Sequence, residues 1–84
     1  MGSANRTMAM VLRGSADAGI AFADLRQLLL TLGFEERTRG SHHLFRMAGV
    51  EEKVNLQRDG AKAKPYQVRQ VRQVILRHGL GDAL

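Results

Sequence analysis

The middle of the chain constrains the possible folds more than any other part of the sequence. It contains three short segments in which apolar residues do not recur with the period of a helix. Two turn-forming stretches, Arg-Gly-Ser and Ala-Gly-Val-Glu, separate these segments. This pattern predicts a three-stranded antiparallel meander with two hairpins. The three expected strands are residues 34–39, 42–48 and 51–57.

Two amphipathic helices are predicted, one on each side of this meander. The first spans residues 22–32 and the second runs from Pro65 to Gly79. Gly33 and Gly79 are suited to end a helix, and Pro65 is suited to begin one because it lacks only an N–H that would be unpaired there. In both segments the apolar residues recur at the spacing of one helical face. They are Phe22, Leu25, Leu28, Leu29 and Leu32 in the first helix, and Val68, Val71, Val74 and Ile75, followed by His78, in the second.

Residues 1–19 form an N-terminal extension in this interpretation, with a short helix at 5–13 and a linker of small residues at 14–19. Residues 58–64 are polar and basic and are predicted to be a loop. The main domain, residues 20–84, is expected to be α+β, with the α-β-β-β-α order of a double-stranded-RNA-binding domain. The extension adds a short N-terminal helix to that order. The two longer helices are expected to pack on one face of the sheet through Leu25, Leu28, Leu29, Val71 and Ile75.

The composition limits the class of protein. A chain of 84 residues is sufficient for a single domain with one small core. It contains no cysteine, which excludes disulfides and thiolate metal sites and fits a reducing compartment. No apolar run reaches the length of a membrane span, and the N-terminus lacks the pattern of a signal peptide. We therefore expect a cytoplasmic protein that does not interact with membranes.

The charge is distributed unevenly along the chain. The net charge is +5, but residues 37–80 contain ten Lys or Arg and three acidic residues, which gives this part +7. A basic half beside a mildly acidic half predicts a face that binds a polyanion such as nucleic acid. A well-solvated surface and attraction to an acidic protein are the alternative explanations.

Two of the three histidines, His42 and His43, are adjacent in the sequence Gly-Ser-His-His-Leu-Phe. Adjacent residues of a strand point to opposite faces of the sheet, so this pair is not expected to share a metal ion. No carboxylate lies close to them in the sequence, and His78 is on the last helix. We therefore predict no metal site. One histidine packed in the core and the other at the surface is the simplest structural explanation.

The chemical hypothesis for this segment is acid–base catalysis on RNA. RNA carries its own nucleophile, the ribose 2′-OH, so its cleavage requires proton transfer and cations that hold the phosphate, and no cofactor. A histidine that titrates near neutral pH can transfer the proton. Arg39 and Arg46 lie within a few residues of the histidines and are predicted to offset the developing negative charge.

The second basic motif surrounds the start of the last helix. Lys62 and Lys64 precede the helix, whose N-terminus carries free N–H groups and partial positive charge, so a phosphate is predicted to bind there. Arg69 and Arg72 are three residues apart on this helix and are predicted to contact RNA from one face. The alternative for these residues is an ordinary solvated helix face.

From about Ile20 to Leu80 the chain resembles the HicA family of toxins. The resemblance rests on a leucine-rich helix ending in LGF, a G-S-x-H turn followed by an apolar residue, a strand ending in NLQ and a terminal helix ending in HGL. It implies a fold like that of the double-stranded-RNA-binding domain, endoribonuclease activity against mRNA (an mRNA interferase), and neutralisation by a HicB-like antitoxin. Alignment at Gly40 and Ser41 places the family's catalytic histidine at His43 and leaves His42 at the variable position.

Two other functions remain open from the sequence. One is a module that binds structured RNA without cutting it, and the other is a protein-interaction domain whose basic face meets an acidic partner. Loss of cleavage with retained RNA affinity on substitution of His43 would distinguish the nuclease from the binding module.

Overall fold

The predicted meander is present as a three-stranded antiparallel sheet in the computed structural model, which describes residues 3–84. Its strands lie in the order β1-β2-β3, and each begins and ends within one residue of the prediction. The two hairpin turns contain Gly40 and Gly49, whose φ angles of 60° and 86° favour glycine because it has no Cβ. The strands are β1 (Glu35–Arg39), β2 (His42–Met47) and β3 (Val50–Leu56).

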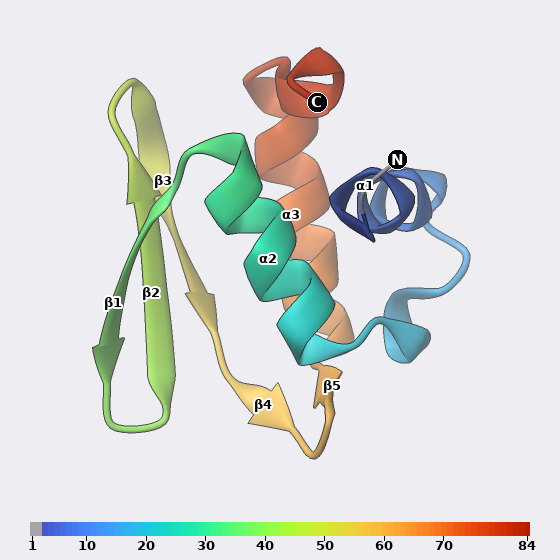
Figure 1. Cartoon of the computed structure of the whole chain (residues 1–84), viewed down its shortest axis with the longest axis vertical. Helices are drawn as coiled ribbons and strands as arrows, with labels where there is room; N and C mark the ends of the chain where they lie inside the picture. Colours follow the sequence, from blue (N-terminus) through green and yellow to red (C-terminus); the bar gives the residue numbers. More distant parts are fainter. Residues whose placement is uncertain (1–2) are drawn as a thin grey trace.

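The two longer helices cover one face of this sheet (Figure 1). Helix α2 (Phe22–Leu32) has the predicted bounds. It ends at Gly33, which has a φ of 107° and donates its N–H to the last turn of the helix. Helix α3 (Pro65–Arg77) begins at the predicted proline and ends one residue before His78, its C-cap. Gly79 then adopts a φ of 64°, and a short 3₁₀ helix, η2 (Leu80–Asp82), follows.

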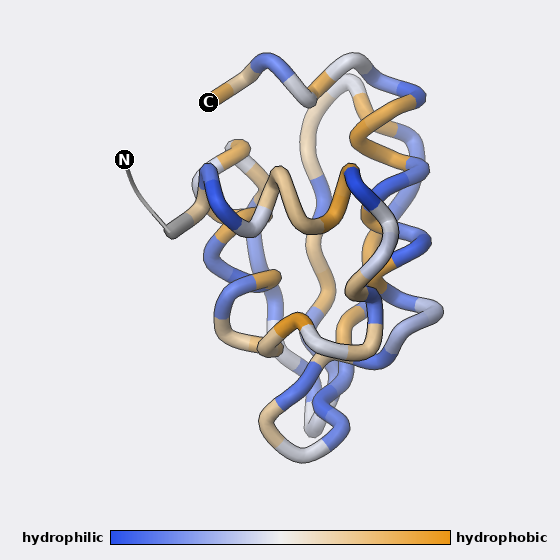
Figure 2. The backbone as a smooth tube through the Cα atoms, turned by 90° about the vertical axis from the view of Figure 1, so that its right-hand side faces the viewer, coloured by the Kyte–Doolittle hydropathy of each residue, from blue (hydrophilic) through white to orange (hydrophobic). Residues whose placement is uncertain are grey.

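The N-terminal helix packs on the other side of the long helices from the sheet. Helix α1 (Ser3–Arg13) begins two residues earlier than predicted. It crosses α2 and α3 on the side away from the sheet, which gives the molecule three layers (Figures 1 and 2). Its Met8 and Val11 are buried in the same hydrophobic cluster as the helices and the sheet. The extension therefore contributes to the core of the main domain.

The hydrophobic core lies between the sheet and the two long helices. The five residues predicted to form this packing are all fully buried, so that prediction is confirmed. Phe45 from β2 and Val54 and Leu56 from β3 complete the core from the sheet side. Among residues 3–84, no helix combines the length and the apolar character that crossing a membrane requires.

The prediction of a loop at residues 58–64 is wrong, because this segment forms a second, two-stranded hairpin. Strands β4 (Arg58–Asp59) and β5 (Lys62–Ala63) pair antiparallel. The Phe22 N–H donates to the carbonyl of Ala61 at 3.0 Å, and the Ala63 N–H donates to the carbonyl of Ile20 at 2.9 Å. These bonds fix the hairpin to the start of α2. Strands of two residues are too short to show an alternating pattern in the sequence.

A bidentate ion pair connects α3 to the segment between α1 and α2. Arg72 donates from Nη1 to Oδ1 of Asp17 at 2.9 Å and from Nη2 to Oδ2 at 3.1 Å. The same guanidinium donates to the carbonyl of Val11 at 3.0 Å. Asp17 lies in a short 3₁₀ helix, η1 (Asp17–Gly19), and the hydrogen bond from Arg72 lowers the pKa of its carboxyl. Arg72 is therefore bound within the protein.

Substitution of Asp17 by asparagine is expected to reduce the free energy of unfolding at pH 7 by about 1–3 kcal/mol, because it removes hydrogen bonds to a charged group. The folded-state pKa of Asp17 is lowered, so its stabilisation is complete above the ordinary carboxyl pKa and is lost as the pH falls below it. The difference between Asp17→Asn and the parent should therefore shrink below about pH 4. Urea denaturation at pH 7 and pH 3 measures this difference. Asp24→Asn, at an exposed carboxylate, is the control, and a difference independent of pH would contradict the assignment.

Candidate active site around His43

The two adjacent histidines lie on opposite faces of the sheet, as predicted. His42 is exposed on the outer face, where its Nδ1 lies 3.3 Å from Oδ1 of Asn55. His43 lies on the face that carries the helices. Its ring meets the ring of Phe22 edge-on, with centroids 4.9 Å apart and planes at 66°. The side chain of His43 remains 20% exposed, so it is partly buried and still reaches solvent.

The ring of His43 is held by Glu36 of β1. The distance from His43 Nδ1 to Glu36 Oε2 is 2.8 Å. Arg26 of α2 binds the same carboxylate, with its Nε 2.8 Å from Oε2 and its Nη2 2.7 Å from Oε1. Three side chains from three elements, Arg26, Glu36 and His43, therefore form a continuous chain of polar contacts.

The charge state of Glu36 determines the tautomer of His43. The hydrogen bond from Arg26 lowers the pKa of Glu36 most strongly, and the hydrogen bond from His43 lowers it further, whereas partial burial opposes both. An ionised carboxylate only accepts hydrogen bonds, so Nδ1 of His43 must be the donor. In the neutral ring the lone pair is then on Nε2, for which no residue in the described part of the chain supplies a hydrogen-bond partner. His43 can accept a proton at this atom and later release it.

The structure brings the cationic side chain of Arg58 close to Phe22, the ring that contacts His43. The β4–β5 hairpin places its guanidinium carbon 4.7 Å from the centre of the Phe22 ring. Phe22 thus contacts His43 and Arg58 at the same time. Arg58 is exposed, so it is available to an anion that approaches the site.

The sequence did not identify either Glu36 or Arg58 as site residues. Glu36 is seven residues from His43 in the chain, and the two meet because the register pairs His43 with Thr38, which places Glu36 diagonally across from it. That contact could have been predicted only with the strand register. Arg58 belongs to residues 58–64, which the sequence predicts to be a loop.

Arg39 and Arg46 do not lie beside His43. Residues directly opposite each other in the β1–β2 pair share a face, and Arg39 pairs with His42 while Arg46 pairs with Glu35. Both arginines therefore project from the outer face of the sheet, and the expectation that they offset charge next to His43 does not match this geometry. That they contact RNA remains a prediction.

Of the four cations predicted near the last helix, Arg72 forms an ion pair, whereas Lys62, Lys64 and Arg69 form none with the described residues. Lys62 is exposed on β5, and its backbone bridges to Ala21, next to Phe22. Its Nζ lies 3.5 Å from the carbonyl of Gly19. Arg69 is exposed on α3, whereas Arg72 is bound to Asp17 within the protein. Among these predicted cations, Lys62 is therefore the one that pairs through its backbone with the segment just before Phe22.

The start of α3 offers a phosphate fewer N–H donors than expected. Lys64 is the N-cap residue of this helix, and Pro65, the first helical residue, has no N–H. The N–H groups of Gln67 and Val68 both donate to the carbonyl of Lys64, at 2.9 Å and 3.2 Å. The predicted phosphate site therefore depends mainly on the lysine side chains.

The third histidine lies away from this site. His78 Nε2 is 2.7 Å from Oε1 of Glu52, which connects the end of α3 to β3, and this hydrogen bond is the main cause of the lowered pKa of Glu52. Within residues 3–84, no group of three histidine, aspartate or glutamate side chains comes together in an arrangement that could hold a metal ion.

Comparisons of this chain with protein-family models, with curated proteins and with solved structures give no match.

Proposed function

We propose that this protein is a metal-independent endoribonuclease of the toxin type, an mRNA interferase that acts in the cytoplasm and is neutralised by a HicB-like antitoxin. The observation that carries the proposal is the 2.8 Å contact between His43 Nδ1 and ionised Glu36, which leaves Nε2 as the atom that can transfer a proton. The sequence resemblance to HicA toxins points to the same histidine. The α-β-β-β-α order is also compatible with a fold like that of the double-stranded-RNA-binding domain.

The proposed reaction uses the 2′-OH of the RNA as the nucleophile. Nε2 of His43 accepts the 2′-OH proton while the 2′-oxygen forms a bond to the adjacent phosphorus. The bond from phosphorus to the 5′-oxygen breaks, and that oxygen takes a proton from water, while His43 later returns its proton to the solvent. The products are a 2′,3′-cyclic phosphate and a 5′-OH end. Glu36 stabilises the imidazolium that forms, as a carboxylate beside a catalytic histidine does in hydrolases.

Cations near Phe22 complete the proposed site. Arg58 lies over the face of the Phe22 ring, and Lys62 is on the paired strand of the same hairpin. Their charges offset the extra negative charge that the phosphate acquires in the transition state. Lys64 and Arg69 extend the basic surface along α3 in this proposal. Arg72 is left out because it is bound to Asp17.

The proposal is tested by substrate chemistry. The purified chain is incubated in EDTA with an mRNA fragment that it cleaves, and with the same fragment carrying a single 2′-deoxynucleotide 5′ to the cleaved bond. We expect the all-ribose fragment to yield cyclic-phosphate ends and the deoxy fragment to remain intact at that bond. Similar affinity for the two fragments would show that the loss is chemical. Cleavage of the deoxy fragment at the parent rate would exclude the 2′-OH as nucleophile, and RNA binding without any cleavage would favour the binding module.

RNA affinity is expected to depend on the β4–β5 hairpin. Each lost phosphate contact reduces the slope of log affinity against log salt by about one unit or less. The double variant Arg58→Ala/Lys62→Ala should therefore show a slope lower by about one to two units. The matched control is Arg6→Ala/Arg13→Ala, which removes two exposed charges from α1. Equal slopes for the parent and the hairpin variant would remove this surface from the model.

A further inference from the structure

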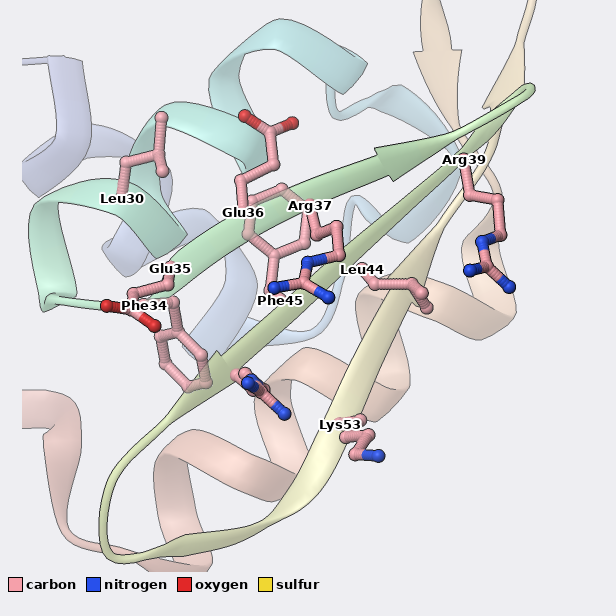
Figure 3. Close-up of a pocket in the computed structure, with 10 residues that line it drawn as sticks. Leu30, Phe34, Glu35, Glu36, Arg37, Arg39, Leu44, Phe45 and Lys53 are labelled. Atoms are coloured by element: carbon pink, nitrogen blue, oxygen red, sulfur yellow. The ribbon is translucent and has the colours of Figure 1, made fainter.

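A groove follows the exposed edge of the sheet at β1, and its lining includes Glu36, the partner of His43, but not His43 itself. Its volume is about 610 Å³, within the range of sites that bind small ligands or a few side chains. Residues on both sides of the strand line it, including Leu30 from α2 on one side and Leu44 from β2 on the other (Figure 3). The groove therefore extends over the edge of the sheet between its outer face and α2.

The outer side of this groove is strongly basic. In Figure 3 the side chains of Arg37, Arg39 and Lys53 project from one face of the sheet, and Glu36 projects from the other. The basic residues of the lining are Arg37, Arg39, Arg46 and Lys53. None of them forms an ion pair with another residue in the described part of the chain. Two carboxylates also line the groove, but Glu36 is ion-paired with Arg26, which leaves Glu35 as the acid without an ion pair in the described residues.

The edge of β1 supplies backbone groups as well as charge. β1 is the first strand of the order β1-β2-β3, so one side of it has no neighbouring strand in the described residues. Its pairing with β2 is regular over all five residues, whereas the β2–β3 pair contains a register shift. A regular, unpaired edge can accept a further strand through main-chain hydrogen bonds.

Charge and side-chain alternation define what such a strand would contain. In an added strand, alternate side chains would face the outer side, with Arg37 and Arg39, and the others would face Leu30 of α2. Carboxylates in the first set would complement the two arginines, and apolar side chains in the second set would complement Leu30. A second copy of this chain is a poor occupant, because its own edge arginines would face those of the first. Among the described residues, the exposed ring on the outer face is that of His42, which meets Asn55 and is not part of the groove lining, so the groove itself offers RNA bases no stacking platform.

We propose that the β1 edge is a docking site for an extended segment of a partner protein in which acidic and apolar residues alternate. The segment would pair with β1, place its carboxylates against Arg37 and Arg39, and place its apolar side chains against Leu30. This inference rests on the charge and shape of the groove and does not depend on ribonuclease activity at His43.

The test measures binding of a fluorescent ten-residue peptide of alternating glutamate and valine by anisotropy. Reversal of two charges, in Arg37→Glu/Arg39→Glu, should weaken binding about tenfold or more, because two attractive pairs become repulsive. Arg6→Glu/Arg13→Glu makes the same charge change on α1 and should change affinity by less than about twofold. In the parent, the amide NMR signals of residues 35–39 should shift and gain protection from exchange.

Three results would overturn the proposal. The first is equal binding of a control peptide that contains five glutamates followed by five valines, since strand addition requires the alternation. The second is amide shifts in another element without any in β1. The third is a loss of affinity for single-stranded RNA in Arg37→Glu/Arg39→Glu that equals the loss for the peptide, which would identify the face as a nucleic-acid surface, the competing role that the sequence predicts for Arg39 and Arg46.

Discussion

His43→Ala is expected to reduce RNA cleavage by roughly 10²-fold or more, the usual contribution of a general acid or base. The variant loses the imidazole whose Nε2 we propose to transfer the proton, on the ring that shares Phe22 with Arg58. RNA affinity should change little, because binding comes mainly from contacts of arginine and lysine with phosphate. Cleavage rate and RNA affinity of the purified variant are the two measurements, and growth arrest on expression should be lost together with cleavage.

His42→Ala is the matched control for this prediction. It removes the same type of side chain at the adjacent position, on the outer face of the sheet. Among the described residues, the side chain of His42 has Asn55 as its hydrogen-bond partner, and strand parity places it on the opposite face of the sheet from Glu36. We expect this variant to retain most of the parent activity. If His42→Ala were inactive and His43→Ala active, with both variants folded, the assignment would be reversed.

Stability must be measured in parallel, because His43 also packs against Phe22. His43→Gln keeps much of the volume and a polar group that can meet Glu36, so it should fold and still fail to cleave. Glu36→Gln removes the charge that fixes the tautomer, so we expect a partial loss of cleavage and a changed pH profile. Cleavage by His43→Ala at the parent rate would exclude the proposed mechanism and make the RNA-binding module the better explanation.

The fold was predictable where periodicity was long enough to be seen. Helix α2 has the predicted bounds because its leucines repeat over three turns and Gly33 ends it. The strands of the meander were located because glycine turns separate them. The β4–β5 hairpin was not predictable because its strands of two residues carry no visible pattern, and because the backbone hydrogen bonds that attach it to the start of α2 are made with residues 20 and 22, which are distant in the sequence.

The site was predictable only in part, because proximity in sequence differs from proximity in space. Arg39 and Arg46 are within four residues of His43 in the sequence, yet strand alternation places them on the other face. The same alternation correctly separated His42 from His43. Glu36 and Arg26 reach His43 through strand register and helix packing, and a single sequence specifies neither directly.

Phe22 is the residue through which the core and the candidate site are connected. It is fully buried at the start of α2, and its ring contacts both His43 and Arg58. Its backbone N–H also holds the β4–β5 hairpin through the carbonyl of Ala61. The ring therefore contributes to stability through burial and also contacts two polar side chains, one in an edge-to-face pair and one in a cation–π contact.

Two substitutions separate these roles of Phe22. Phe22→Ala should reduce the free energy of unfolding by about 3–5 kcal/mol, which a domain of this size can hardly tolerate. Phe22→Leu keeps an apolar side chain and should cost less than about 1.5 kcal/mol, so the variant should fold. It nevertheless loses the aromatic contacts of His43 and Arg58, so we expect its cleavage rate to fall by more than its loss of stability explains. Denaturation midpoints and cleavage rates of the two variants measure this separation. Full activity in a folded Phe22→Leu variant would mean that Glu36 alone positions His43, and that the ring serves only the core.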